Sequence, residues 1–193
     1  MHPILLDWII SPYESLYKAL EDAFSWFFKE LELVDSRTST KDRYGFNFHH
    51  VWHEKLPGSE PLGTIDWQSL IPSITEKLNR KIERFRGVCN SNRPVVFVRY
   101  ESIDKHKSIE LKDLIRSKYP NLTFVLMVVE PSEDFEEPWG LENISNFSII
   151  YNDSDKWRAA FKEVALKFDS ELTIDGISEV PREETQALRP DGT

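Results

Sequence analysis

The first part of the chain combines a short apolar run with a long amphipathic segment. Residues 4–10 are mostly apolar and predict a short buried strand or an extended entry segment. Ser11-Pro12-Tyr13-Glu14 then supplies a helix start, with Ser as N-cap, Pro at the first helical position and Glu at the third. Apolar residues follow at spacings of four and three, which predicts a core-facing helix of about five turns: Leu16, Leu20, Phe24, Phe27 and Leu31.

Residues 44–53 alternate with a period of two and predict a strand. Its first face is aromatic apart from one histidine: Tyr44, Phe46, Phe48, His50 and Trp52. His49 and His53 lie on the opposite face. Polar residues before the strand, and Pro and Gly after it, indicate a loop on each side.

A second helix is predicted after Asp66, which is its expected N-cap. Its buried stripe has spacings of four and three: Leu70, Ile74, Leu78, Ile82 and Phe85. Pro72 falls in the first turns or kinks the helix. Basic residues lie largely outside the stripe, which indicates a solvated face or, alternatively, an anionic partner: Lys77, Arg80, Lys81, Arg84 and Arg86.

From Pro94 onward the pattern changes to strands that are buried on both faces. Residues 95–100 and 122–129 are nearly continuous apolar runs, and residues 108–118 between them have helical spacing. This order predicts two parallel strands joined by a right-handed crossover. Residues 147–151 predict a third strand, followed by capping residues and a helix whose buried stripe is Trp157, Phe161, Val164 and Phe168.

Together these elements predict an α/β protein with a three-layer, Rossmann-like core, built from a mostly parallel sheet and flanking helices. The length of 193 residues fits one domain, which we place at residues 1–180. Residues 172–180 are expected to add a short edge strand. Residues 181–193 contain little apolar surface, and we expect a flexible C-terminal tail there.

Composition narrows the class of protein more than it narrows the function. The 24 Lys and Arg against 33 Asp and Glu give a net charge of −9, which argues against nucleic acid as a partner. No apolar run approaches the roughly 20 residues that span a bilayer. The single cysteine, Cys89, excludes an internal disulfide and fits a reducing compartment. We therefore expect a soluble, cytoplasmic protein.

Sequence motifs for cofactors are missing as well. No glycine-rich phosphate loop occurs, so no nucleotide cofactor is expected. On a strand, His49 and His53 would lie about 13 Å apart and could not share a metal ion, so no metal site is expected. The partner is an unidentified small molecule or protein, and the pattern does not indicate an oligomeric state.

Candidate binding residues follow the predicted parallel strands. In open α/β sheets, ligands bind outside the carboxyl ends of the strands. Those positions hold Arg99, Glu101, Glu130, Asn152 and Asp153. Arg99 could bind a carboxylate or phosphate through its planar fork, and Glu130 and Asp153 could act as acid or base. Helix capping and loop solvation are the alternative roles for these residues.

Two further residues are candidates for chemistry. His50, among aromatic residues, could act as a base or orienting group, or as a hydrogen-bonded structural histidine. Cys89 lies near the expected end of the second helix, where the helix dipole disfavours the thiolate that a nucleophile needs. We expect Cys89 not to be a nucleophile.

Three short segments carry a family resemblance: Leu6-Asp7-Trp8-Ile9-Ile10-Ser11-Pro12, then Tyr44-Gly45-Phe46-Asn47-Phe48-His49-His50, then Pro94-Val95-Val96-Phe97-Val98-Arg99. In this order the chain resembles a bacterial family of papain-like cysteine peptidases, from about Leu6 to Trp157. The resemblance implies a Cys-His-Asp arrangement. By motif position, His50 would be its histidine and Asp153 the candidate acidic partner.

The cysteine nucleophile that the resemblance implies does not occur in this sequence. The family pattern places that cysteine in an S-L-G-x-x-C segment upstream of D-W-I, whereas no cysteine precedes Asp7, and Val51 stands where the pattern is often acidic. Either the chain begins after the family's first strand and nucleophile, or this member performs no thiol chemistry. We expect an incomplete or inactive hydrolase. The alternatives are a non-catalytic interaction protein and a Rossmann-like transferase that binds an anionic donor, so enzymatic activity stays open.

Overall fold

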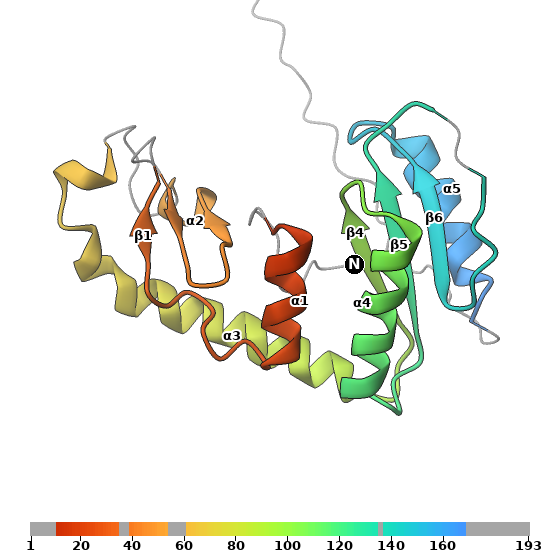
Figure 1. The fold of residues 1–193 in the computed structure, drawn as a ribbon, viewed down its shortest axis with the longest axis horizontal. Coiled ribbons are helices and arrows are strands. Elements are labelled where there is room, and N and C mark those ends of the chain that lie inside the picture. The colour runs from red at the N-terminus through yellow and green to blue at the C-terminus, as the bar shows by residue number, and fades with distance from the viewer. Residues whose placement is uncertain (1–10, 35–38, 54–60, 135–136, 169–193) are drawn as a thin grey trace, which may run out of the picture.

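The computed structural model describes residues 11–34, 39–53, 61–134 and 137–168 (Figure 1). The strand expected at residues 4–10, the edge strand at 172–180 and the tail at 181–193 lie outside these residues. The helices and strands are α1 Tyr13–Glu21, β1 Glu32–Leu33, β2 Thr40–Lys41, β3 Asn47–Phe48, α2 His50–His53, α3 Ile71–Cys89, β4 Val95–Tyr100, α4 Lys105–Lys118, β5 Phe124–Glu130, β6 Ile144–Ser148 and α5 Ser154–Ala165. Short 3₁₀ helices occupy Leu62–Thr64 and Trp67–Leu70.

The second half of the chain forms a parallel sheet in the order β4-β5-β6. Val95 pairs with Phe124, and Leu126 pairs with Ile144. The central strand β5 is buried along its length. Alternate β5 side chains pack with α4 on one face and with α5 on the other. Figure 1 shows these two helices on opposite sides of the sheet. The sequence-based prediction of an α/β protein with a parallel sheet and flanking helices is therefore confirmed.

The first half forms a second, smaller sheet that the sequence did not predict. Its three strands are antiparallel, in the order β1-β2-β3, and each is only two residues long. Aromatic rings hold it together through edge-to-face contacts, for example between Phe28 and Phe48, whose centroids are 5.0 Å apart. The indole N–H of Trp52 donates to the Thr40 hydroxyl at 3.1 Å. We call residues 22–53 the aromatic region and residues 94–168 the parallel-sheet region.

The long helix α3 joins the two regions, running from beside the small sheet to the start of β4 (Figure 1). The buried stripe that the spacing predicts is present, with Ile74, Leu78 and Ile82 at most 5% exposed. Asp66, however, precedes a 3₁₀ helix, and its side chain makes no cap hydrogen bond there. Pro72 lies in the first turn of α3, where its missing N–H costs nothing.

The first helix is much shorter than its apolar spacing predicts. It ends at Glu21, and Pro12 occupies the N-cap position in place of Ser11. Ala23 and Phe24 then adopt positive φ angles of 57° and 62°, which no α-helix contains. Phe24 and Phe27 are nevertheless buried, because successive turns bring them to the core. Turns, and not one long helix, therefore bury the apolar residues that are spaced four and three positions apart.

The prediction that residues 44–53 form one strand is also wrong for most of these residues. Only Asn47–Phe48 is a strand, and His50–His53 form one helical turn. Gly45 has a φ of 92°. The positive φ favours glycine at this turn, and a Cβ there would also lie close to the Ser15 hydroxyl, at 3.3 Å.

The third parallel strand was expected three residues too late. The structure places β6 at Ile144–Ser148 rather than at 147–151. Its buried residues include Ser145 and Asn146, which broke the apolar pattern. The Asn146 side chain is paired, since its amide donates to the Glu137 carbonyl and its oxygen accepts from the Trp139 N–H.

Candidate functional site

Arg99 forms the centre of a polar cluster at the carboxyl end of β4. Its guanidinium donates to the Ser11 hydroxyl at 2.9 Å, to the Ser11 carbonyl, and to the Glu101 carboxylate. The side chain is only 9% exposed. Burial lowers the pKa of Arg99 to about 10, and its Nε has no hydrogen-bond partner among the described residues. The predicted site residues Arg99 and Glu101 are thus in direct contact.

Ser11 is the member of this cluster that sequence reasoning missed. The sequence pattern predicts Ser11 as a helix N-cap, yet its side chain and its carbonyl both bind a guanidinium 88 positions away. The signal available was that Ser11 and Arg99 each sit in one of the three family-like segments. Two of these segments therefore meet in space, at the edge of the sheet where α/β proteins bind ligands.

Glu130 lies at the carboxyl end of β5. Strand β5 is the neighbour of β4, the strand that carries Arg99. Its carboxylate accepts from the Ser102 hydroxyl at 3.0 Å. The backbone joins the neighbouring ends, because Glu101 N–H donates to the Val129 carbonyl and Ile149 N–H donates to the Glu130 carbonyl. The structure therefore places Arg99, Glu101 and Glu130 along one edge of the sheet.

Asn152 and Asp153 lie in the turn between β6 and α5. The Asp153 carboxylate accepts from the Lys156 N–H at 3.0 Å, and so caps α5. It also faces the Lys156 ammonium at 3.7 Å. Asn152 is exposed. These contacts give Asp153 the capping role that was the alternative to a catalytic one.

His50 begins α2, which lies beside the small sheet. In Figure 1, α2 and α5 lie toward opposite ends of the long axis of the molecule, with the parallel sheet on the side of α5. The segment that carries His50 is therefore distant from the one that carries Asp153. Within the described ranges, no group of three or more His, Cys, Asp or Glu side chains could hold a metal ion.

Cys89 occupies the last residue of α3 and is 3% exposed. Burial raises the pKa of its thiol to about 12, against a weaker opposite effect of the hydrogen bond with Tyr119. A raised pKa keeps the thiol in its neutral form, which is a poor nucleophile. Its environment is that of a buried apolar side chain and not of a nucleophile.

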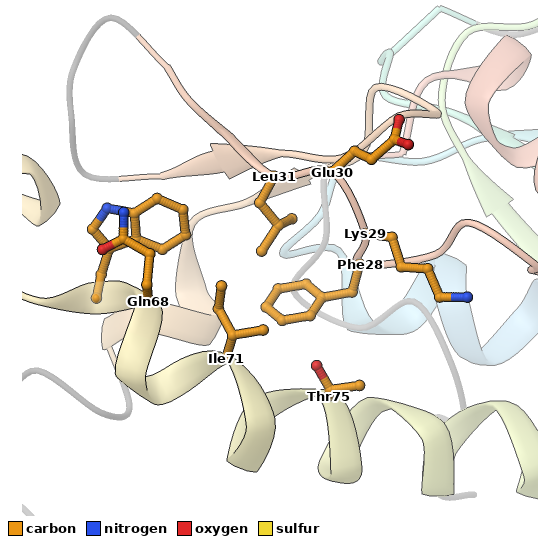
Figure 2. A pocket seen from close by; sticks show the side chains of 8 residues that line it. Phe28, Lys29, Glu30, Leu31, Gln68, Ile71 and Thr75 are labelled. Atoms are coloured by element: carbon orange, nitrogen blue, oxygen red, sulfur yellow. The ribbon is translucent and has the colours of Figure 1, made fainter.

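A cavity of about 440 Å³ lies away from all of these residues, between residues 28–31 and the start of α3 (Figure 2). Phe28, Leu31 and Ile71 point toward its centre, with Gln68 and Thr75 on the α3 side. Its two charged neighbours have other partners. The Lys29 ammonium donates to the Ser25 carbonyl at 2.7 Å, and the Glu30 carboxylate lies 3.6 Å from Arg43.

The described residues form a mixed helix–strand protein with a parallel sheet. A buried arginine cluster lies at the carboxyl edge of that sheet, and these two features define the class of protein. The chain belongs to the family described as "putative papain-like cysteine peptidase", whose model matches residues 3–130. This match includes Ser11, His50 and Arg99 but ends before Asp153. Comparisons with curated proteins and with solved structures give no match.

The described helices of the structure are too short or too polar for a bilayer. None of them, in the part of the chain that the structure describes, is long and apolar enough to cross a membrane.

Proposed function

We propose that residues 1–193 are an incomplete or inactive member of the papain-like cysteine peptidase family that does not hydrolyse peptides by itself, and that these residues bind a partner on a peptidase-type scaffold. One observation carries the proposal: the chain's only cysteine is buried, with its thiol held in the neutral form. A peptidase of this class needs a thiolate with a histidine beside it. Cys89 instead has Tyr119 as its hydrogen-bond partner.

The remaining parts of a Cys-His-Asp arrangement do not support hydrolysis either. Asp153 caps α5, and the helix that contains His50 lies in a different region of the molecule. We propose that His50 and Asp153 have structural roles, and that Arg99, Glu101 and Glu130 mark the ligand-bearing edge of the sheet. This edge corresponds to the binding crevice of a three-layer, Rossmann-like protein, which we propose as the architecture.

The test measures hydrolysis and thiol reactivity on the same protein. We expect no cleavage of fluorescent casein and no labelling by an epoxide thiol probe at neutral pH. Iodoacetamide should modify Cys89 only after unfolding in urea, because burial hides the thiol. Glutathione in the same buffer provides the reference rate for an exposed thiol.

The Cys89→Ser variant is the matched control, since it removes the only sulfhydryl and changes the volume little. Native protein that cleaves casein, with the cleavage lost in Cys89→Ser, would overturn the proposal. Cleavage that survives in Cys89→Ser would overturn it as well, and would point to a different nucleophile.

A further inference from the structure

The cavity of about 440 Å³ at the start of α3 has a floor of aromatic rings. Phe28 and Trp67 line it and are only 3% and 7% exposed. Trp52 packs against both from behind, with its ring centroid 6.0 Å from that of Phe28 and 5.5 Å from that of Trp67. The Trp52 indole is fixed in turn by its hydrogen bond to Thr40. The floor is therefore held in place by the core beneath it.

The helical wall of the cavity carries neutral polar groups that have no partner in the fold. Gln68, Ile71 and Thr75 line this wall and are spaced three and four positions apart, which places them on one face of the helical turns. No hydrogen bond joins the Thr75 hydroxyl or the Gln68 side-chain amide to another described residue. Both groups are thus available to a ligand.

The wall opposite α3 follows a path that only contacts from elsewhere can hold. Phe28 and Glu30 have φ angles of 56° and 53°, which are unfavourable for residues with a Cβ. The Phe28 N–H donates to the Asp42 carboxylate at 3.0 Å, and the Lys29 carbonyl accepts from the Arg43 N–H at 3.3 Å. Backbone strain that the surroundings maintain is typical of ligand sites. These contacts keep the wall from relaxing into the cavity.

The cavity directs no charge at a ligand. Of its lining residues, Lys29 and Glu30 are charged. The Lys29 ammonium donates to the Ser25 carbonyl, and the Glu30 carboxylate faces Arg43. Figure 2 shows both side chains extending away from the centre of the cavity. Because a charged group buried without a partner costs free energy, the lining favours a neutral ligand.

The lining also indicates the chemistry of that ligand. The rings of Phe28 and Trp67 favour an aromatic group, since aromatic rings attract each other beyond the area they bury. An amide and a hydroxyl can each donate and accept, so Gln68 and Thr75 suit peptide groups beside the ring. The volume lies in the range of ligand pockets, about 300–1,000 Å³. Tryptophan and tyrosine combine these properties and are the usual anchors at the centre of protein interfaces.

We propose that this cavity binds a neutral aromatic residue, tryptophan or tyrosine, in a segment of a partner protein. The aromatic ring lies against Phe28 and Trp67, and the peptide groups beside it pair with Thr75 and Gln68. This inference names the partner class of the proposed binding role and rests on that role. We call the cavity the α3 pocket, lined by Phe28, Leu31, Trp67, Gln68, Ile71 and Thr75.

The test titrates the protein with the capped peptide acetyl-Gly-Gly-Trp-Gly-Gly-amide and follows backbone amides by NMR. We expect saturable shifts at Phe28, Leu31, Ile71 and Thr75, with a dissociation constant of about 1 mM or tighter for one anchor residue. Leucine in place of tryptophan keeps an apolar side chain without a ring and should weaken binding about fivefold. Lysine at that place brings a charge that the pocket does not match, and should give no saturable binding.

Free indole distinguishes a residue of a partner protein from a free aromatic molecule. It has the ring and its N–H but no peptide groups to pair with Thr75 and Gln68. We expect indole to bind at least about tenfold more weakly than the tryptophan peptide. Equal affinity of the two would overturn the assignment to a protein segment.

Two variants of Thr75 and one matched control test the pocket itself. Thr75→Phe places a ring in the open space, so it should abolish binding without lowering the free energy of unfolding. A loss of stability would overturn the proposal, because the space would already be filled. Thr75→Val removes only the hydroxyl and should weaken binding about fivefold. Asn79→Val, one turn further along α3 and outside the lining, should leave the affinity unchanged.

Three binding results would also overturn the inference: no saturable binding of the tryptophan peptide, equal affinity for the lysine peptide, or shifts confined to residues outside the α3 pocket. Each is distinguishable from failure of the proposed function. That failure appears as cleavage of casein, whereas failure of this inference appears as absence of peptide binding by a protein that cleaves nothing.

Discussion

The aromatic region and the parallel-sheet region are stabilised in different ways. In the parallel-sheet region, β4 and β5 are in register over six residue pairs, and backbone hydrogen bonds define the strands. In the aromatic region each strand has two residues, so the backbone ladder is minimal. Contacts between side chains stabilise this region in place of a longer backbone ladder. Regular backbone structure follows from a local pattern, whereas a region organised by side chains depends on contacts remote in sequence.

Asp42 illustrates this substitution. Its buried carboxylate accepts hydrogen bonds from the backbone N–H groups of Phe28, Tyr44, Gly45 and Phe46, at 3.0 to 3.1 Å. One side chain thereby links Phe28 to the turn at residues 42–46. Burial raises the pKa of the Asp42 carboxyl, although the four N–H groups act in the opposite direction.

The helices of the parallel-sheet region also differ from the helices that lie outside both regions. Asp104 caps α4 and Asp153 caps α5, each by accepting a backbone N–H three residues later. Neither α1 nor α3 has a side-chain cap hydrogen bond. Tertiary packing therefore contributes more to the placement of α1 and α3 than local capping does.

Phe46→Ala should have the largest effect on stability. Phe46 is fully buried and contacts the rings of Phe27 and Phe48 edge to face. Loss of the ring leaves a cavity, which should cost about 3–5 kcal/mol in urea unfolding. Trp26→Ala, at a 38% exposed ring, is the control and should cost less than about 1 kcal/mol. Equal losses would show that the aromatic core is not packed as described.

Asp42→Ala comes next, with an expected cost of about 2–3 kcal/mol, because several N–H groups lose their acceptor. The pH dependence has a definite sign. Since the pKa is raised in the folded state, the folded protein binds more protons, and its stability relative to Asp42→Asn should fall as pH rises through that pKa. A relative stability that rises with pH in urea unfolding would contradict the raised pKa.

Arg99→Lys should cost about 2 kcal/mol, since an ammonium cannot reach Ser11 and Glu101 with the geometry of a planar fork. This change tests the link between the parallel sheet and the start of α1. Glu101→Gln, which keeps an oxygen acceptor, should cost less. Thermal unfolding of both variants gives the comparison, and a smaller loss for Arg99→Lys than for Glu101→Gln would rule out Arg99 as the centre of the cluster.

Asp104→Ala should have the smallest effect, about 1 kcal/mol, because it removes the cap of a helix that is otherwise well packed. Asp104→Asn keeps an oxygen that can accept the Lys107 N–H, and it should restore most of the loss in the same urea experiment. If Asp104→Asn were as unstable as Asp104→Ala, the cap would not be the source of the stability.

The parallel-sheet region could be predicted closely from the sequence. Strand β4 matches the expected residues 95–100, and β5 differs by one or two residues at its ends. A strand buried on both faces is a continuous apolar run, so the run marks the strand directly. Strand β6 was displaced because Ser145 and Asn146 are buried and polar.

The candidate site could be predicted only in part. The carboxyl-edge rule nominated Arg99, Glu101 and Glu130, and the structure places these at one edge. The contact between Ser11 and Arg99 could not be predicted, because a helix-cap pattern also explains Ser11. The roles of His50 and Asp153 remain predictions, which the hydrolysis measurements test.

The sequence alone determined the family, the parallel pairing and the buried faces of its strands and of α3, because these depend on periodicity and on short motifs. Only the tertiary structure decided where the first helix ends, that residues 44–53 divide into a turn, a strand and a helix, and which residue Arg99 binds. Apolar spacing states which side chains must be buried, but several backbone paths can bury the same rings. In the aromatic region the choice among those paths rests with the Asp42–Phe28 hydrogen bond and with ring packing such as Phe27 on Phe46, which join residues outside any local pattern.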